Sequence, residues 1–455
     1  MAVEKHGRRA VGKAFGGRGR AAALAAGAVV VALTAVSPAL AVGDRAGSER
    51  STVPAGTGAV QASAGTSSPS VGRAAYDLGD LAFAPGAPYK GRNEIAAVVR
   101  YPEGAGSEGL ARGRHPLIVM QHGQWATCAD RAAQNALVKA RKALALAEEA
   151  GDEAEAARQR AVVDRMSERL WAWPCRAGIA PLPSSSGYDY LAESLARQGF
   201  VVVSMGANGI NATSGGQADS VYRARADLIN KHLDLWRQLD AGKGPLKGKL
   251  KDPETGRVSD APFAGHLDLQ RVGALGHSMG GGGVMQQVAD GRHGDWPAGV
   301  KVKAALGLAP TATWDNEPVT KVPLAVLWGT CDQVNTGEYV KWNRKDNKAP
   351  LHGITLTGGN HNYFNTQWSP GSGQVAGEDD AIPGGQPGRC VAQDGTDQEH
   401  RGLDEATQRR IATGYTVAFF RRYLMGDTSA DALLTGRKKL PDVPDVVRVE
   451  YVKPH

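Results

Sequence analysis

The chain has 455 residues, of which 42% are hydrophobic and 22% are charged, and its formal net charge is +7. This composition is that of an ordinary globular protein and excludes collagen-like and intrinsically disordered chains. Residues 1–41 hold six Lys or Arg and one Glu, so five of the seven positive charges lie there and +2 remains for the rest. The charge therefore does not indicate a nucleic-acid-binding protein.

The amino-terminal segment has the pattern of a secretory signal peptide. Basic residues precede the apolar stretch Ala21–Val36, and an A-x-A cleavage pattern ends at Ala41. A membrane anchor is the alternative interpretation, although about 20 apolar residues are needed to span a bilayer. The pair Arg8-Arg9 leaves the twin-arginine export route open. We expect residues 1–41 to be removed and the mature protein to be secreted to the extracellular space.

Residues 42–73 are rich in Gly, Ala, Ser and Thr and are expected to form a disordered linker before one catalytic domain at 74–455. In that domain, short apolar runs alternate with segments of helical periodicity. This alternation predicts an α/β fold with a mainly parallel sheet and helices on both faces. We expect strands at Ile95–Tyr101, Pro116–Gln121, Phe200–Ser204, Arg271–Leu275, Val302–Leu308, Pro323–Trp328 and Gly353–Leu356, and helices at Gly187–Gln198, Ser220–Leu239, Met279–Asp290 and Glu405–Tyr423.

One segment interrupts this alternation. Residues 129–168 are rich in Ala, Glu, Arg and Lys, with a break at Gly151-Asp152. The pattern predicts a helical hairpin inserted after the strand Pro116–Gln121. The hairpin is too polar to belong to the core, and we interpret it either as a lid over a site or as a solvated decoration of the surface.

The four cysteines are Cys128, Cys175, Cys331 and Cys390. An even number in an exported protein predicts two disulfides, and four cysteines allow three pairings. We favour Cys128 with Cys175 and Cys331 with Cys390, because each bond then closes one insertion. The chain has no C-x-x-C spacing, so we expect no metal site.

The most informative motif is Gly-His-Ser-Met-Gly at residues 276–280, a G-x-S-x-G pentapeptide between a predicted strand and a predicted helix. At such a junction a serine lies on a sharp turn with its hydroxyl exposed, and flanking glycines avoid collisions with neighbouring backbone. The bare motif also occurs in ordinary turns. Its position directly after the strand Arg271–Leu275 makes Ser278 a candidate nucleophile.

A serine nucleophile needs a base, and the base needs an orienting acid. Asp332 follows the strand Pro323–Trp328, and His361 follows the strand Gly353–Leu356. The carboxyl ends of parallel strands meet at one edge of a sheet, and the order Ser, Asp, His is that of an α/β-hydrolase. Asp315 is a competing candidate for the acid. Alternatively, Asp332 is only a turn residue, since Asp favours turns, and His361 is only a packing residue in its loop.

Acyl transfer also needs hydrogen-bond donors for the developing oxyanion. We expect one donor to be the backbone N–H of Met279, directly after the serine. The other is expected from the loop His122-Gly123-Gln124-Trp125, with the backbone N–H of Gln124 as the donor. Trp125 is expected to line the acyl side of the substrate site, and its alternative interpretation is a packing tryptophan.

The run Gly276–Gly283 resembles the nucleophile elbow of the actinobacterial cutinases and polyester hydrolases, serine esterases of the α/β-hydrolase superfamily. In that family a Met after the serine contributes to the oxyanion hole, and a glycine run lets the helix pack close to the sheet. Tyr188–Val203 also resembles the helix and strand ahead of the elbow in dienelactone-hydrolase-like enzymes. This chain differs by the insertion at 129–168 and by Gln124, which stands in place of an aromatic residue. The resemblance therefore implies the fold and the triad, but not a polymer substrate.

Together these patterns predict a secreted carboxylic ester hydrolase in which Ser278, Asp332 and His361 act through an acyl-enzyme. The expected substrate is an ester, whether a small molecule, a lipid or a polymer. The protein is expected to act as a monomer without a cofactor, a metal, nucleic acid or a stable membrane anchor. Two alternatives remain: a secreted peptidase or amidase that uses the same triad, and a non-catalytic secreted binding protein that retains the fold.

Overall fold

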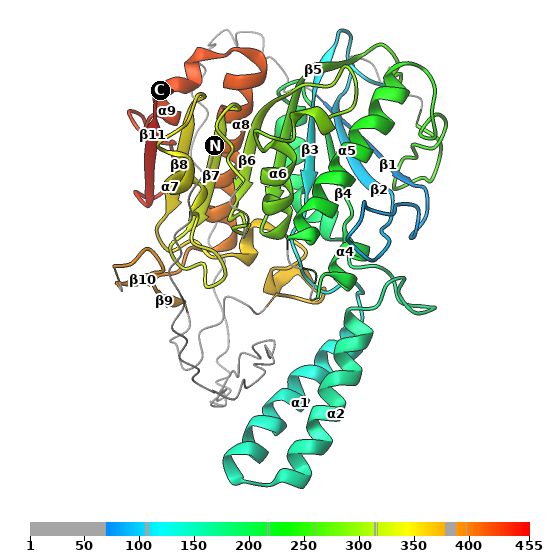
Figure 1. The fold of residues 1–455 in the computed structure, drawn as a ribbon, viewed down its shortest axis with the longest axis vertical. Coiled ribbons are helices and arrows are strands. Elements are labelled where there is room, and N and C mark those ends of the chain that lie inside the picture. Colours follow the sequence, from blue (N-terminus) through cyan, green and yellow to red (C-terminus); the bar gives the residue numbers. More distant parts are fainter. Residues whose placement is uncertain are drawn as a thin grey trace, which may run out of the picture.

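The computed structural model describes residues 70–455 apart from 105–108, 216, 218, 260, 314, 316, 378–387 and 397. At its centre is a nine-stranded sheet in the order β1-β2-β4-β3-β5-β6-β7-β8-β11 (Figure 1). The strands from β4 to β8 in this order are parallel, whereas β1, β2 and β11 pair antiparallel with their neighbours. The predicted α/β architecture with a mainly parallel sheet is therefore confirmed. The strands are β1 (Val71–Asp77), β2 (Ala96–Pro102), β3 (His115–Gln121), β4 (Val201–Met205), β5 (Leu267–His277), β6 (Val302–Leu308), β7 (Leu324–Gly329), β8 (Leu351–Leu356) and β11 (Val447–Val452).

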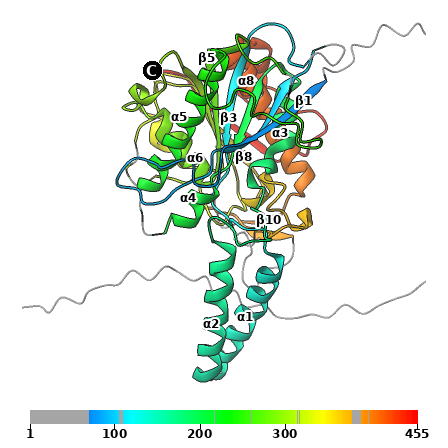
Figure 2. The same cartoon turned by 90° about the vertical axis from the view of Figure 1, so that its right-hand side faces the viewer.

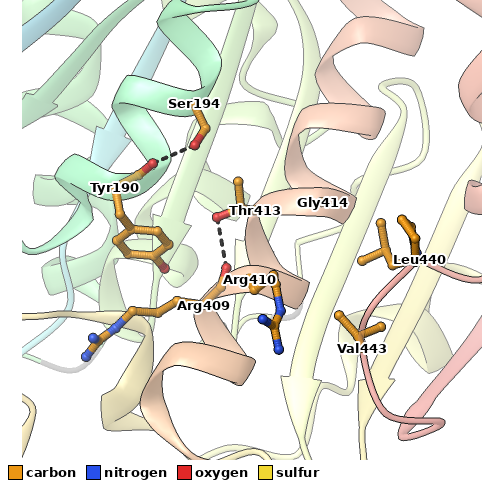
Figure 3. A pocket seen from close by; sticks show the side chains of 9 residues that line it. Tyr190, Ser194, Arg409, Arg410, Thr413, Gly414, Leu440 and Val443 are labelled. Atoms are coloured by element: carbon orange, nitrogen blue, oxygen red, sulfur yellow. Dashed lines mark hydrogen bonds between the residues drawn. The ribbon is translucent and has the colours of Figure 1, made fainter. Parts of the chain in front are cut away.

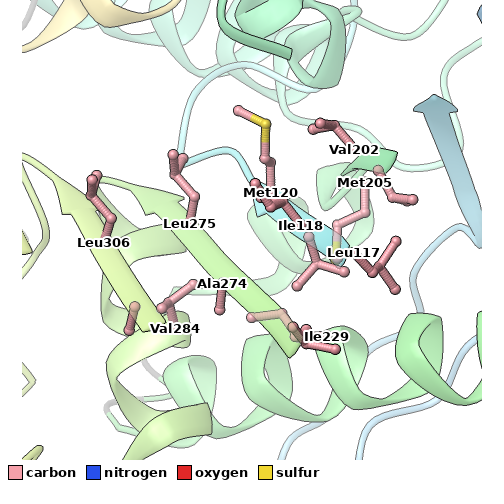
Figure 4. Packing of buried hydrophobic residues seen from close by; sticks show 14 of the residues in the cluster. Leu117, Ile118, Met120, Val202, Met205, Ile229, Ala274, Leu275, Val284 and Leu306 are labelled. Atoms are coloured by element: carbon pink, nitrogen blue, oxygen red, sulfur yellow. The ribbon is translucent and has the colours of Figure 1, made fainter. Parts of the chain in front are cut away.

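The central strands are buried on both faces. Every residue of β3 and of β4 is buried, as expected for parallel strands that are covered by helices on each side. Ile118 and Met120 of β3, Val202 of β4, Leu275 of β5 and Leu306 of β6 belong to one contiguous apolar cluster (Figure 4). This core fixes the carboxyl ends of the parallel strands relative to one another.

Two layers of helix cover the sheet. On one face, α3 (Asp189–Ala196) and α8 (Glu405–Met425) pack against each other, α3 on β2 and β4 and α8 on β5 and β6. On the other face, α5 (Ser220–Asp240) and α6 (Met279–Val288) pack together over β3 and β5 (Figure 2). The shorter elements are α4 (Asn208–Thr213), α7 (Tyr339–Asn343), α9 (Asp431–Leu434) and a small hairpin of β9 (Arg389–Val391) and β10 (Glu399–Arg401).

The inserted segment forms two helices as predicted, α1 (Arg131–Ala150) and α2 (Glu153–Leu170). The pair projects from the body of the molecule at the end of the sheet where the parallel strands finish (Figures 1 and 2). Its base is anchored by a small apolar cluster in which Leu137 and Leu170 join Trp368 and Val375. The hairpin extends away from the sheet, and its role as a lid or as surface decoration stays a prediction.

The four cysteines are paired as the sequence analysis favoured. The Cα atoms of Cys128 and Cys175 are 5.7 Å apart and those of Cys331 and Cys390 are 5.6 Å apart, both within the range of a disulfide. The first pair closes the base of the α1–α2 hairpin, and the second ties the loop after β7 to β9.

The prediction is wrong at the two edges of the sheet. β1 begins at Val71 and pairs with β2, so the last residues of the expected linker are part of the sheet. β11 has no counterpart in the prediction, because this short, half-exposed strand gains its stability from pairing with β8. The predicted signal peptide, and the linker as far as residue 69, lie outside the described residues. Within the described part of the chain, no helix combines the length and the apolar character needed to cross a bilayer.

Candidate active site

Ser278 lies at the junction of β5 and α6, as the G-x-S-x-G pattern predicts. Its backbone has φ 55° and ψ −128°, a conformation that is strained for a residue with a side chain. The two glycines make the turn possible: a Cβ at Gly276 would overlap the backbone of Gly280, and one at Gly280 would overlap the backbone at the end of β3. The turn therefore brings Ser278 against the loop that follows β3.

That loop passes directly beside the serine. A Cβ added to Gly123 would overlap the Cβ of Ser278, so only glycine allows this close approach. Ser278 itself is 4% exposed. The expected oxyanion loop and the expected nucleophile are thus in direct contact.

His361 and Asp332 form a buried, hydrogen-bonded pair. His361 Nδ1 lies 2.8 Å from Asp332 Oδ2, and the side chains are 2% and 0% exposed. The other carboxylate oxygen, Asp332 Oδ1, accepts the backbone N–H groups of Val334 and Asn335, each at 2.8 Å. Because the carboxylate is held on both oxygens, it can fix the orientation and the tautomer of the imidazole.

The competing acid, Asp315, is bonded elsewhere. Its Oδ1 accepts a hydrogen bond of 2.7 Å from Gln286, and its Oδ2 lies 3.5 Å from Arg223. The structure therefore pairs His361 with Asp332 and leaves Asp315 outside the site.

The turn after β6 joins the serine to the acid. The carbonyl of Ser278 accepts the N–H of Thr311 at 3.0 Å. Asn335, whose backbone donates to Asp332, donates through its side chain to the carbonyl of Ala309 at 2.9 Å. The turn after β6 is therefore hydrogen-bonded both to the nucleophile and to the loop that carries the acid.

The side chain before the nucleophile supports the base. His277 Nε2 lies 3.1 Å from the His361 carbonyl, their ring centroids are 4.8 Å apart, and His277 Nδ1 lies 2.9 Å from the Tyr188 hydroxyl. Burial lowers the pKa of His277 well below its ordinary value, so the ring is neutral and donates from Nε2 to the carbonyl. His277 thus contacts the base from the position next to the nucleophile, a role that the sequence did not predict.

The carbonyls of the loop after β3 are held from inside the protein. Arg225 Nη1 donates to the carbonyl of His122 at 3.0 Å, and Asn211 Nδ2 lies 3.1 Å from the Gly123 carbonyl and 3.3 Å from that of Trp125. Arg225 also donates to Asn211 Oδ1. Burial lowers the pKa of Arg225 to about 10, which leaves the guanidinium charged at neutral pH.

Arg225 and Asn211 are functional candidates that the sequence analysis missed. A signal for Arg225 was present, because it lies at helical spacing from Val221 and Ile229 on the apolar face of α5. A charge on such a face indicates a buried partner. Asn211 carries no comparable signal, since its role depends on where α4 packs.

The side chains of Gln124 and Trp125 both have partners in the protein. Gln124 Nε2 donates to Ser214 Oγ at 2.8 Å. Trp125 Nε1 donates to the carbonyl of Val375 at 2.8 Å, and its ring packs edge-on against Trp171. These contacts match the packing interpretation of Trp125, and its role in substrate binding stays a prediction.

The expected oxyanion donor Met279 lies at the start of α6. Met279 is the first residue of this helix, and the first N–H groups of a helix have no partner within it. The positive end of the helix dipole therefore faces the position next to Ser278.

A separate cavity of about 460 Å³ lies between α3, α8 and the segment 440–443 (Figure 3). Arg409, which lines this cavity, already donates to the carbonyl of Tyr363 at 2.9 Å. None of the three predicted triad residues lines the cavity. In the described ranges of the chain, no group of three or more His, Cys, Asp or Glu is placed to hold a metal ion.

No model of a known protein family matches this chain, and no curated protein matches it. What the site does must therefore be argued from its own residues and geometry.

Proposed function

We propose that the chain is a secreted serine hydrolase with an α/β-hydrolase fold that cleaves carboxylic esters through an acyl-enzyme. The observation that carries the proposal is the buried bond of 2.8 Å between His361 Nδ1 and Asp332 Oδ2, at the sheet edge that also presents Ser278 on a strained turn. Catalytic sites typically contain a residue whose strained backbone is held in place by surrounding contacts. A buried acid–base pair is equally typical of them.

In the proposed reaction, Ser278 Oγ attacks the ester carbonyl and His361 Nε2 accepts its proton. Asp332 stabilises the imidazolium that forms and does not itself take up the proton. The tetrahedral intermediate collapses, the alcohol leaves with the proton from His361, and an acyl-enzyme remains. Water then attacks the acyl group with His361 as the base, and the carboxylic acid is released with Ser278 restored.

The negative charge on the carbonyl oxygen is stabilised by two backbone donors, the N–H groups of Met279 and Gln124. Removal of one donor of this kind typically costs 10²–10³-fold in kcat. The close approach of Gly123 to Ser278 supports this assignment, because it brings the loop that carries Gln124 next to the nucleophile.

The nucleophile is tested with a fluorophosphonate probe, which labels activated serines. The wild-type protein is expected to be labelled and Ser278→Ala is expected to remain unlabelled, whereas the control Ser194→Ala on α3 should be labelled like the wild type. Equal labelling of the wild type and Ser278→Ala would overturn the proposal.

The reaction class is tested with p-nitrophenyl esters of increasing acyl length beside aminoacyl p-nitroanilides. We expect turnover of the esters and little turnover of the anilides. The reverse preference would identify a peptidase or amidase with the same triad. A labelled protein that turns over neither series would contradict the ester assignment.

Secretion is proposed from the leader pattern and the two disulfides, which persist in oxidising compartments. Expression of the full chain with sequencing of its amino terminus tests this proposal. Protein in the medium should begin at Val42. A protein that stays in the cell with residues 1–41 attached would contradict it.

A further inference from the structure

The loop after β3 rests on a buried positive charge. Arg225 is 0% exposed, and its guanidinium forms no ion pair with an Asp or Glu among the described residues. Instead it donates to the His122 carbonyl at 3.0 Å and to Asn211 Oδ1. Burial of a charge is costly unless the charge is well hydrogen-bonded. The two groups that accept hydrogen bonds from Arg225 therefore indicate which part of the structure the buried charge stabilises.

We propose that Arg225 and Asn211 are positioning residues that aim the Gln124 N–H at the developing oxyanion. The argument follows from the planarity of the peptide bond. The carbonyl of Gly123 and the N–H of Gln124 belong to one trans peptide unit and point in opposite directions. The Gly123 carbonyl is bonded by Asn211 Nδ2 at 3.1 Å and by His122 Nδ1 at 2.8 Å, so the Gln124 N–H faces the other way.

The arginine determines which way the Asn211 amide points. An arginine can only donate hydrogen bonds, so the group of Asn211 that faces it must be the oxygen. The NH₂ group is then turned toward the loop, where it reaches the carbonyls of Gly123 and Trp125 at 3.1 and 3.3 Å. A flipped amide would place its oxygen against two carbonyl oxygens.

The fold supplies the room for this pair. A Cβ at Gly283 of α6 would meet the Cβ of Arg225, so glycine at this position lets α5 approach and bring the guanidinium under the loop. Asn211 is carried by α4, whose first N–H groups, of Asn208 and Gly209, donate to the buried Glu94 carboxylate at 2.8 and 3.0 Å. Both supports are therefore fixed by packing rather than by solvent-exposed contacts.

This inference rests on the proposed ester hydrolysis, and Asn211→Ala tests it most directly. The variant removes one of the two donors to the Gly123 carbonyl, keeps the other, His122 Nδ1, and leaves the triad in place. We expect kcat to fall about tenfold to a hundredfold, less than the 10²–10³-fold for loss of a donor, with KM unchanged. A boronic acid that mimics the tetrahedral intermediate should lose affinity by the same factor, whereas the carboxylic acid product should not.

Arg225→Lys and Arg225→Met test the second residue. Lys keeps the charge and a hydrogen-bonding ammonium group, so it should retain more of the wild-type kcat than Met does. These variants also decide the question if Asn211→Ala does not fold. The matched control is Arg100→Met, because Arg100 is a buried arginine that pairs with Asp189 at 2.7 Å on the α3 side of the sheet. It should lower the melting temperature without changing kcat.

Three results would overturn the inference: a folded Asn211→Ala with wild-type kcat, a loss that lies in KM alone, or equal weakening of the boronic acid and the product. If the wild-type protein hydrolyses no ester, the proposed function fails instead. Amide hydrogen exchange at Gln124 then separates the two proposals. Faster exchange in Asn211→Ala would support the positioning role, and unchanged exchange would overturn it.

Discussion

The active-site region around Ser278 and the α1–α2 hairpin both lie at the edge of the sheet where the parallel strands end, yet they are stabilised differently. In the active-site region, the charged side chains of Asp332, in the loop after β7, and Arg225, on α5, are fully buried and bonded to backbone groups or to a buried amide. In the hairpin, the pair Arg160–Glu148 has side chains that are 48% and 37% exposed.

The value of a charged contact in this protein therefore depends on where it lies. A buried charge with fixed partners cannot be replaced without leaving another group unpaired, which is strongly destabilising or disruptive. The two charges of an exposed ion pair remain largely hydrated, so the pair contributes little to the free energy of folding. Substitutions should accordingly have large effects in the active-site region and small ones at exposed pairs of the hairpin such as Arg160–Glu148.

The largest effect is expected for Asp332→Asn. The change removes the acceptor for His361 Nδ1 while the shape is kept, so the wrong tautomer is favoured and kcat should fall by about 10⁴-fold. Asp315→Asn is the control and should leave kcat unchanged. Steady-state kinetics on one p-nitrophenyl ester measures both. If Asp315→Asn instead abolishes turnover, the acid has been misassigned.

The next effect concerns the disulfide beside the acid. Replacing Cys331 and Cys390 by Ser opens a loop with a sequence separation of 59 residues and should cost about 2–5 kcal/mol of unfolding free energy. Turnover should fall as well, because Cys331 adjoins Asp332. The matched variant lacks Cys128 and Cys175, whose separation is 47, and should lose similar stability with a smaller loss of turnover. Equal effects on turnover would remove the distinction between the two regions.

In the pH range where histidine titrates, acid should affect the body of the protein and not the hairpin, which contains no histidine. Burial lowers the pKa of His232 to about 3, below its ordinary value of 6.5. The unfolded chain then binds more protons below pH 6.5, so stability is lost as the pH falls. For His232 alone this loss is about 1 kcal/mol between pH 6.5 and 5.5. Urea unfolding of the wild type and His232→Gln measures it, and the variant should show a flatter pH dependence. Parallel pH curves would refute the assignment.

The smallest effect is expected in the hairpin. Arg160→Ala removes the exposed pair with Glu148, which is 2.7 Å long, and should change the unfolding free energy by less than about 1 kcal/mol. Turnover of a small ester should not change. Thermal unfolding and ester kinetics check both statements, and Glu148→Ala should behave in the same way. A loss of turnover in both variants would support the lid interpretation.

The sequence predicts those parts of the fold whose signals are local. β3 and β4 are short, wholly apolar runs, and the alanine-rich hairpin has a clear break at Gly151. The strand–turn–helix context of Ser278 follows from five consecutive residues. The sequence did not predict β1 and β11, because each is an edge strand. The formation of such a strand depends on its neighbour more than on its own composition.

The supports of the site depend on tertiary contacts and are harder to predict. The position of Asp332 and His361 after successive strands is a local signal, and the structure places their side chains 2.8 Å apart. In contrast, Asn211 bonds the carbonyl of Gly123, 88 residues away in the chain, and His277 bonds that of His361, 84 residues away. No periodicity or motif in the sequence indicates a contact between segments so far apart in the chain.

The far end of the hairpin is the turn at Gly151-Asp152 (Figure 1). Since α1 has 20 residues, this turn stands about 30 Å from the base of the hairpin. Exposed turns of small and polar residues accept insertions well. The turn is therefore a suitable attachment site. A peptide tag or a tether to a solid support placed there would hold the protein through the α1–α2 hairpin and leave the strand ends and Ser278 undisturbed.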